Sequence, residues 1–288
     1  MAVTERELAS LEAGLDALEL ARSERAFSLR RLIWAVVPPV AALAVVVAVW
    51  QIAVWLQLKP QYALPSPADV AASLGQQARG GHLTEALFTS LSHAAVGYGM
   101  SLVLGTLIGV ATARIPLLRT SIGPILAGLQ SLPSVAWVPF AILFFGLVPS
   151  AIYFVVVMGA LPSIANGVVA AYDQVPPLLL RVGRAMGARG FSLYRHVVLP
   201  AGMPSYVAGL KQAWSFSWRS LMAAELIANS PGLGQGLGHL MDDGRSLSDM
   251  SLVIAVIFLI LIVGIAVDEL IFAPLDRGIR HRRGLTVV

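Results

Sequence analysis

The chain has 288 residues, of which 57% are hydrophobic and only 12% are charged, and its mean hydropathy is +0.77. A soluble globular chain carries about 25% charged residues, so this composition indicates an integral membrane protein. The absence of cysteine excludes disulfides and thiolate metal sites, and the five histidines never approach the spacing of a metal-binding motif. The basic pI of about 9.8 is explained by arginine in cytoplasmic loops rather than by nucleic-acid binding. We expect no metal, no cofactor and no nucleic-acid partner.

The first 31 residues are polar and charged and precede a long apolar run. A secretory signal would place a short apolar core directly after a few basic residues, so we interpret residues 1–31 as an uncleaved cytoplasmic segment. Leucines spaced along one helix face, with a capping-box pattern at Thr4 and Glu7, predict an amphipathic helix over residues 4–24. Its polar face is acidic, which disfavours anionic lipid. We expect this helix to pack along the membrane edge or against a neighbouring subunit.

Six stretches are long and apolar enough to cross a bilayer, which takes about 20 mostly apolar residues. They lie near residues 33–57, 88–112, 121–145, 149–171, 205–228 and 251–272. We therefore expect an all-α membrane protein with six transmembrane helices over residues 32–275, followed by a basic cytoplasmic tail over 276–288. Only Gly146, Leu147 and Val148 separate the third stretch from the fourth, and this predicts a tight hairpin.

Arginine is distributed unevenly over the connections between these stretches. It gathers before the first, between the second and third, between the fourth and fifth, and after the sixth, whereas the remaining loops hold only Lys59, Arg79 and Arg245. Because cytoplasmic loops carry the excess of Lys and Arg, we expect a multi-pass protein with both termini in the cytoplasm.

Several expected spans carry groups that a simple anchor does not need. Ser101, Gly105 and Gly109 recur at four-residue spacing and predict a small-residue ridge for close helix packing. Prolines in the third and fourth spans free backbone carbonyls, which must be satisfied within protein or against a water-lined cavity. For any single Ser or Pro, packing alone is the simpler interpretation. Taken together, the polar groups indicate a path through the bundle, with candidates Gln130, Asn166, Ser215, Arg219 and Glu225.

Arg219 lies near the middle of the fifth span, where an arginine costs at least about 2.5–3.5 kcal/mol to insert. Such a side chain should face a cavity or a partner. One interpretation is an attractive site for an anionic solute. The alternatives are a structural pair with Glu225 or with a backbone carbonyl, or a side chain that snorkels outward.

A basic stretch punctuated by glycine, RAMGARGFSLYRHVVLP, occupies residues 184–200 between the fourth and fifth spans. Proline at the first turn predicts a short helix over 177–186, and Gly187 suits the left-handed position that closes it. A second short helix is expected over 191–198, stopped by Leu199 and Pro200. Arginines alternate with apolar anchors, as in a helix that docks in a groove of a partner, but a plain cytoplasmic loop explains the charges equally well.

This stretch resembles the cytoplasmic-loop signature of permease subunits of bacterial ABC importers. Gly187 and Ala188 match its Gly-Ala pair, Tyr194 its aromatic position, and VVLP at 197–200 its ending. The glutamate of the signature falls on Arg181, which is a departure. The resemblance implies a coupling helix, within a loop over about 173–203, that docks in a cleft of an ATPase, and the charge reversal predicts a matching acid there. The implied coupling residues are Arg181, Arg184, Met186, Gly187, Ala188, Arg189, Phe191, Tyr194, Leu199 and Pro200.

Three further segments resemble the nitrate/sulfonate/bicarbonate/taurine subgroup of these permeases: LPSPADV (64–70), SLPSVAWVPFAILFFG (131–146) and SPGLGQGLG (230–238). The resemblance implies a type I importer fold in the bacterial inner membrane, two permease copies, two ATPase subunits and an extracytoplasmic substrate-binding protein. The chain itself has no phosphate-binding G-x-x-x-x-G-K-[ST] motif and is expected to be no enzyme. We expect an aliphatic sulfonate as the solute; nitrate, bicarbonate, taurine and a thiamine-precursor pyrimidine stay open.

Two other classes of protein could have broken, polar spans. An ion-coupled secondary carrier usually shows an internal repeat, and we find none between the halves of this sequence. A membrane-embedded enzyme would need convergent catalytic side chains. The acids within the spans are only Glu225, Asp268 and Glu269, and His93 stands alone in the second span. Neither alternative explains the loop.

Overall fold

The structure is a computed structural model that describes residues 29–228 and 231–281. The chain divides into two compact units, residues 1–61 and 62–288, and each is considered by itself. The described part of the first unit is one helix, α2 (Leu29–Trp55), which overlaps the first expected span. The expected amphipathic helix over 4–24 and the tail beyond His281 lie outside the described residues, so both stay predictions.

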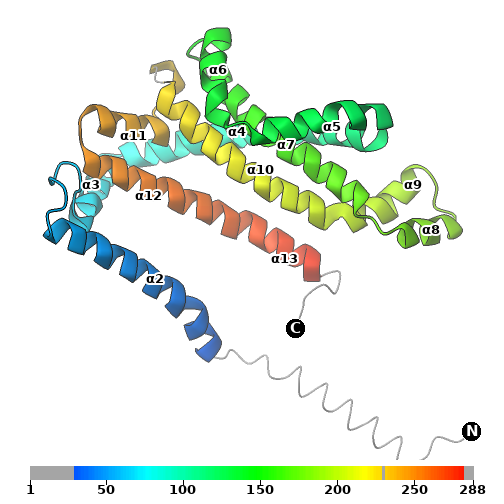
Figure 1. Ribbon diagram of the computed structural model, residues 1–288, viewed down its shortest axis with the longest axis horizontal. Coiled ribbons are helices and arrows are strands. Elements are labelled where there is room, and N and C mark those ends of the chain that lie inside the picture. The colour runs from blue at the N-terminus through cyan, green and yellow to red at the C-terminus, as the bar shows by residue number, and fades with distance from the viewer. Residues whose placement is uncertain (1–28, 229–230, 282–288) are drawn as a thin grey trace, which may run out of the picture. The chain divides into compact units, whose positions relative to one another are not determined.

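The second unit is built from helices, and no strand occurs in its described part (Figure 1). Its α-helices are α3 (Pro67–Arg79), α4 (His82–Arg114), α5 (Pro116–Ser131), α6 (Trp137–Phe145), α7 (Pro149–Asp173), α8 (Pro177–Ala185), α9 (Phe191–Leu193), α10 (Leu199–Ile227), α11 (Leu237–Ser246), α12 (Met250–Val267) and α13 (Ala273–His281). Short 3₁₀ turns, η1 (Ser134–Ala136) and η3 (Pro231–Leu233), and π-helical turns, η2 (Tyr194–Val198) and η4 (Asp268–Phe272), join some of them. The all-α prediction is confirmed.

Among the described residues, three continuous helices are long and apolar enough to cross a membrane: α4, α7 and the run Met250–Ile279. The third expected span, 121–145, is not one straight helix. α5 and the η1–α6 segment meet at an angle of 96°, and only together do they pass as a fourth span. The cause is local: Leu132 precedes Pro133, and a residue before proline is pushed out of the helical region. Both adopt extended backbone, with ψ of 131° and 124°.

α10 covers the fifth expected span and is 29 residues long, but its composition is too polar to identify it as a span. In α2, only Val40–Trp55 forms a short apolar helix by the same measure. Length and composition therefore identify three candidate spans in the described part of the chain, or four with the bent pair, and the count of six stays a prediction. The hairpin between the third and fourth stretches is confirmed, because α6 ends at Phe145, α7 begins at Pro149, and Gly146 turns the chain with φ +80°.

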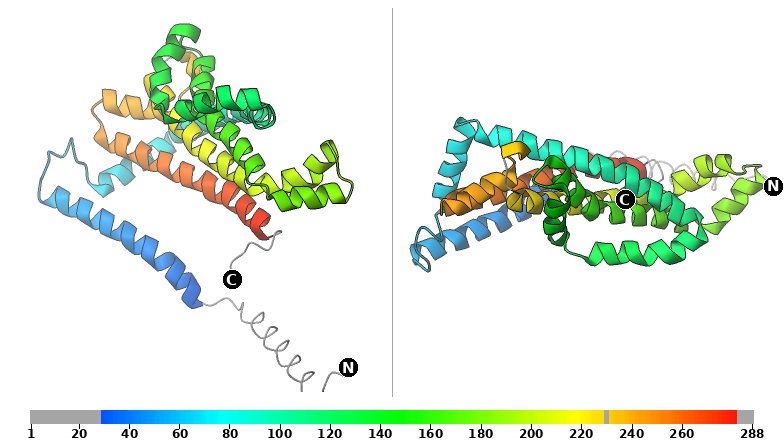
Figure 2. Two further views of the ribbon diagram at one scale, coloured as in Figure 1. Left: turned by 45° about the vertical axis from the view of Figure 1, so that its right-hand side comes forward. Right: turned by 90° about the horizontal axis from the view of Figure 1, so that it is seen from above.

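α7 lies between α4 and α10 and contacts both along much of its length (Figures 1 and 2). On the α4 side, a Cβ added to Gly105 would lie 2.8 Å from Cβ of Ile164, and one added to Gly109 would lie 2.7 Å from Cβ of Val168. Real Cβ atoms do not approach this closely, so only glycine lets the helices meet. The predicted small-residue ridge is confirmed, and it is used within the chain.

The α7–α10 contact is equally close. A Cβ on Gly209 would lie 2.6 Å from Cα of Gly167 on α7. Toward its other end, α10 is fastened to α12 by Trp218, whose indole N–H donates to the carbonyl of Ile260 at 3.1 Å. The core therefore lies along α7 and α10, and the described polar groups are positioned from these two helices.

Candidate functional site

The bend between α5 and η1 opens a hollow of about 370 Å³ against α7 and α10. Two of the path candidates line it, Gln130 from the end of α5 and Arg219 from α10, together with Gly159 of α7. The extended backbone at the bend forms its rim. The structure thus brings together two candidates that lie far apart in the sequence, and it does so because the third span is broken.

Gln130 links this hollow to α7 through side-chain hydrogen bonds. Its amide nitrogen donates to Ser163 Oγ at 2.8 Å, and its amide oxygen accepts from Asn166 Nδ2 at 2.9 Å. Gln130 and Asn166 are half-buried and Ser163 is buried. Because these amides satisfy one another, they hold the end of α5 in a fixed position over α7.

Arg219 is exposed on α10. Its Nε donates to the carbonyl of Ser215 at 3.1 Å, and its guanidinium carbon lies 4.8 Å from the ring centroid of Phe216. It does not pair with Glu225, so that alternative is wrong, whereas the bond to a backbone carbonyl is present. Within the described part of the chain no carboxylate pairs with Arg219, and its terminal nitrogens remain for a ligand.

Arg219 belongs to a polar, exposed stripe on α10 that follows the spacing of one helix face. The stripe consists of Lys211, Gln212, Ser215 and Arg219. Lys211 forms an ion pair with Asp268 of η4 at 2.9 Å. Apolar surroundings disfavour such a surface, so the stripe requires water or another polar surface beside it.

Glu225 is placed quite differently from the other path candidates, because its side chain is 0% exposed. One carboxylate oxygen accepts from Ser90 Oγ at 2.6 Å and from the backbone N–H of Gly238 at 3.0 Å. The other lies 3.1 Å from Nδ1 of His93. Glu225 therefore ties α4 and the start of α11 to α10, and it does not line the hollow with Arg219.

The start of α11 completes this buried cluster, which we call the Glu225 clamp (Glu225, Ser90, His93 and Gly238). Leu237 N–H donates to Ser90 Oγ at 2.8 Å. Nearby, His239 Nδ1 accepts from Gly236 N–H at 3.2 Å, so its Nε2 donates to the carbonyl of Ala228 at 2.8 Å. Sequence reasoning missed Ser90 and Gly238. The glycine-rich motif SPGLGQGLG was a signal, since its glycines allow the backbone to approach a side chain.

The basic loop forms an elbow at one end of the unit, made of α8, α9 and η2 (Figure 2). The helix expected over 177–186 is observed as Pro177–Ala185, and Gly187 has the expected left-handed backbone, with φ +86°. The second helix is not stopped by Leu199 and Pro200, and this prediction is wrong. The π-helical turn η2 leads directly into α10, with the N–H of Leu199 bonded to the carbonyl of Tyr194. Pro200, which has no N–H to donate, directly follows this π-helical turn, where the regular α-helical bonding is already interrupted.

The expected coupling residues fall into two groups in the elbow. Most are exposed: Arg181, Arg184, Met186, Gly187, Arg189, Phe191, Leu199 and Pro200. Ala188 is half-buried, and so is Tyr194, which points inward. The ring of Tyr194 stacks on Tyr172 of α7, with centroids 6.0 Å apart, and the guanidinium of Arg114 from α4 lies 4.1 Å from its centroid. Tyr194 thus fastens the elbow to the bundle, and the exposed arginines and Met186 and Phe191 form its outer surface.

A family comparison agrees with this architecture. Residues 101–281, more than half of the chain, match the family described as binding-protein-dependent transport system inner membrane component. A solved structure of the MetNI methionine ABC transporter in an inward-facing conformation matches with a TM-score of 0.58 and 20% identity, over 68% of this chain and 95% of that one. At this identity the likeness shows the fold.

Three curated relatives are 27–29% identical to this chain over the aligned residues. The nitrate import permease protein of Synechocystis sp. is 28% identical over 82% of this chain and 86% of its own length. The taurine transport system permease protein of Escherichia coli is 27% identical (77% and 83%), and the riboflavin transport system permease protein of Chloroflexus aurantiacus is 29% identical (80% and 85%). The chain therefore belongs to the binding-protein-dependent inner membrane components, the multi-pass permease subunits of ABC transporters.

Proposed function

We propose that this chain forms the translocation path of an ATP-driven importer for a small anionic solute and that its elbow is the coupling element to a separate ATPase. The observation that carries the proposal is the continuity of the elbow with α10. From Phe191 onward, α9 and η2 continue without a break into α10, which bears Arg219, and α8 with its exposed arginines joins this helix through the glycine turn at 186–190. A displacement of the elbow would therefore reach the face of α10 directly.

The proposal includes six spans with both termini in the cytoplasm. At about 1.5 Å per residue, α10 with its 29 residues exceeds the roughly 30 Å hydrocarbon core of a bilayer, and so does α2 with its 27. Both are long enough to span despite the polar groups in α10. The arginine-rich elbow then lies in the cytoplasm, where an ATPase would bind.

The proposal includes a second copy of the chain, and the exposed polar stripe on α10 supports it. The exposed stripe from Lys211 to Arg219 would be unfavourable against lipid tails, but it suits a water-filled path between two copies. ATP-driven closure of two ATPases would draw two elbows together and favour one of two arrangements of the paired α10 helices. A substrate-binding protein on the outer face would deliver the solute.

The position of Arg219 favours an anionic solute, because its terminal nitrogens could bind an anion in the hollow beside Gln130. We take an aliphatic sulfonate as the first candidate, since a sulfonate presents three oxygens to an arginine. Nitrate and taurine, named in two relatives, also carry negatively charged oxygens. The neutral riboflavin named in a third relative is the contrasting case, and it would not need Arg219.

Affinity purification of this chain from its native bacterial membrane in mild detergent, with mass spectrometry of co-purifying proteins, tests the coupling role. We expect an ATPase with a phosphate-binding loop to accompany the wild-type chain. Gly187→Pro should abolish this association, because proline cannot adopt φ +86° and lacks the N–H that bonds the carbonyl of Arg184 at 3.0 Å. Arg181→Glu should weaken it by reversing an exposed charge.

Arg79→Glu is the matched control, since Arg79 is exposed at the end of α3 on the opposite side of the membrane in this topology. It should retain the ATPase. Each variant is compared only as a monodisperse protein in detergent, so that loss of folding is recognised. If no ATPase accompanies the wild-type chain under any mild condition, or if all three variants retain it equally, the elbow is not a coupling element.

A further inference from the structure

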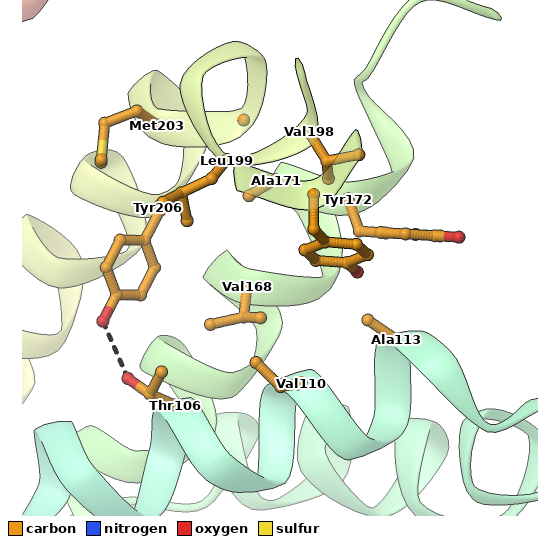
Figure 3. Close-up of a pocket in the computed structure, with 12 residues that line it drawn as sticks. Thr106, Val110, Ala113, Val168, Ala171, Tyr172, Val198, Leu199, Met203 and Tyr206 are labelled. Carbon is orange, nitrogen blue, oxygen red and sulfur yellow. Dashed lines mark hydrogen bonds between the residues drawn. The ribbon is translucent and has the colours of Figure 1, made fainter. Parts of the chain in front are cut away.

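An apolar pocket of about 130 Å³ lies between the bundle and the base of the elbow (Figure 3). Its walls come from α4, α7 and the η2–α10 junction and include Val110, Ala113, Val168, Tyr172, Val198 and Leu199. Most of its lining is apolar, and the hydroxyls of Thr106 and Tyr206 on its wall share a hydrogen bond of 2.8 Å. This pocket therefore suits an apolar group rather than a small polar solute.

The pocket is open at its rim. Val110 is 36% exposed, Tyr172 is 38% exposed and Leu199 is 55% exposed, although all three line it. In the proposed topology this opening lies toward the cytoplasmic face of the membrane. Tyrosines and arginines are typical of the boundary between the hydrocarbon core and the headgroups. In a chain that spans a membrane, the molecule that reaches such an opening is a lipid.

A positive charge stands beside the opening. The guanidinium of Arg114 lies over the ring of Tyr194, which lines the pocket. Among the described residues no carboxylate pairs with Arg114 at the end of α4. By contrast, Arg119 in the first turn of α5 is paired with Asp173. The two arginines thus differ in that Arg114 has its charge available to a ligand.

We propose that this pocket binds one anionic phospholipid of the cytoplasmic leaflet, with a segment of acyl chain between Val110 and Leu199 and the phosphate at Arg114. The proposal rests on the orientation given under the proposed function, but not on the identity of the solute. α4 and α7 form one wall, and the junction that carries the elbow forms the other. A bound lipid would therefore brace the elbow against the bundle, and the lipid composition would influence coupling.

Lipid retention by the assembled transporter tests this proposal. The complex is reconstituted in nanodiscs of phosphatidylcholine with or without phosphatidylglycerol, extracted in mild detergent, and examined by native mass spectrometry for bound phospholipid. We expect one phosphatidylglycerol per chain to survive extraction. Val110→Phe fills the pocket and should abolish its retention. Arg114→Gln should weaken it about fivefold, which corresponds to ~1 kcal/mol for one basic residue at an anionic surface.

Two matched controls accompany these variants. Val103→Phe makes the same change on α4 at an exposed position outside the pocket, and Arg119→Gln removes an arginine that has a carboxylate partner. Both should retain the lipid as the wild type does. Equal retention in all four variants would overturn the site, and equal retention of phosphatidylcholine would overturn the anionic headgroup. If Val110→Phe instead changes the number of chains per complex, the pocket is a protein interface and the lipid proposal fails. None of these outcomes depends on solute uptake, so they are distinct from failure of the proposed function.

Discussion

Two ionisable side chains on α10 have opposite surroundings although they lie close together on the same helix. Arg219 is exposed at the hollow beside the α5 bend, with one bond to a backbone carbonyl. Glu225 is 0% exposed, accepts hydrogen bonds from Ser90 and Gly238, and is hydrogen-bonded to the imidazole of His93. An ionisable residue on a helix of this bundle therefore has no single role. Where neighbours supply every partner it holds the fold together, and where they do not it is available for a ligand.

The largest loss of stability is expected from substitution of Glu225, the buried one of these two residues. Glu225→Ala would leave Ser90, His93 and the N–H of Gly238 without their acceptor in the core. Removing one member of a buried charged cluster costs about 3–5 kcal/mol. We expect a strong drop in the thermal unfolding midpoint of the purified protein in detergent. Glu225→Gln, which keeps one acceptor oxygen and the shape, should lose markedly less; an equal loss for both would show that the carboxylate itself is what the site requires.

A moderate loss of stability is expected at Gly238, which contributes a backbone N–H to the Glu225 clamp. A Cβ at Gly238 would press on the Glu225 side chain and lie 2.8 Å from the backbone nitrogen of Leu226. Gly238→Ala should therefore cost about 1–3 kcal/mol, as overpacking does, measured by the same unfolding experiment. Gly232→Ala, in the same glycine-rich segment, has nothing within 4 Å of the added Cβ and serves as the control. Comparable losses for both variants would mean that close approach to Glu225 is not the reason for the glycine.

The smallest effect on stability is expected at Arg219. Arg219→Gln removes an exposed charge, a bond to one carbonyl and a contact with Phe216, together about 1 kcal/mol or less. If the proposed path is correct, uptake of labelled ethanesulfonate by cells that carry the complete transporter should nevertheless fall about tenfold, since a charge-assisted hydrogen bond is worth roughly 1.5–3 kcal/mol. Arg219→Lys should restore part of it. Normal assembly with unchanged uptake in Arg219→Gln would remove Arg219 from the path and return it to a structural role.

The features that the sequence predicted correctly are those with local causes. The short helix after Pro176, the left-handed backbone at Gly187 and the hairpin at Gly146 each follow from one or two residues. The small-residue ridge follows from the regular spacing of Ser101, Gly105 and Gly109. The family resemblance, carried by the loop signature, agrees with the family match over 101–281.

Two features differ from what the sequence indicated by itself. Leu132 and Pro133 lie in an apolar run long enough to span, but the restriction that proline places on the preceding residue bends that run. Pro200 was expected to end a helix, and this was wrong because the π-helical turn before it continues into α10. The Glu225 clamp could not be derived from sequence, because Ser90 and His93 lie 135 and 132 residues away from Glu225.

The glycine contacts of α7 have a consequence for how this molecule can move. With Gly105 and Gly109 of α4 on one face of α7 and Gly209 of α10 on the other, backbones touch where side chains would ordinarily separate them. Side chains can change rotamer when helices slide, but backbones in contact have no such freedom. We therefore expect α4, α7 and α10 to travel as a single rigid block during a transport cycle. Deformation should concentrate at the extended backbone of Leu132 and Pro133, where the chain departs from helical geometry beside the hollow.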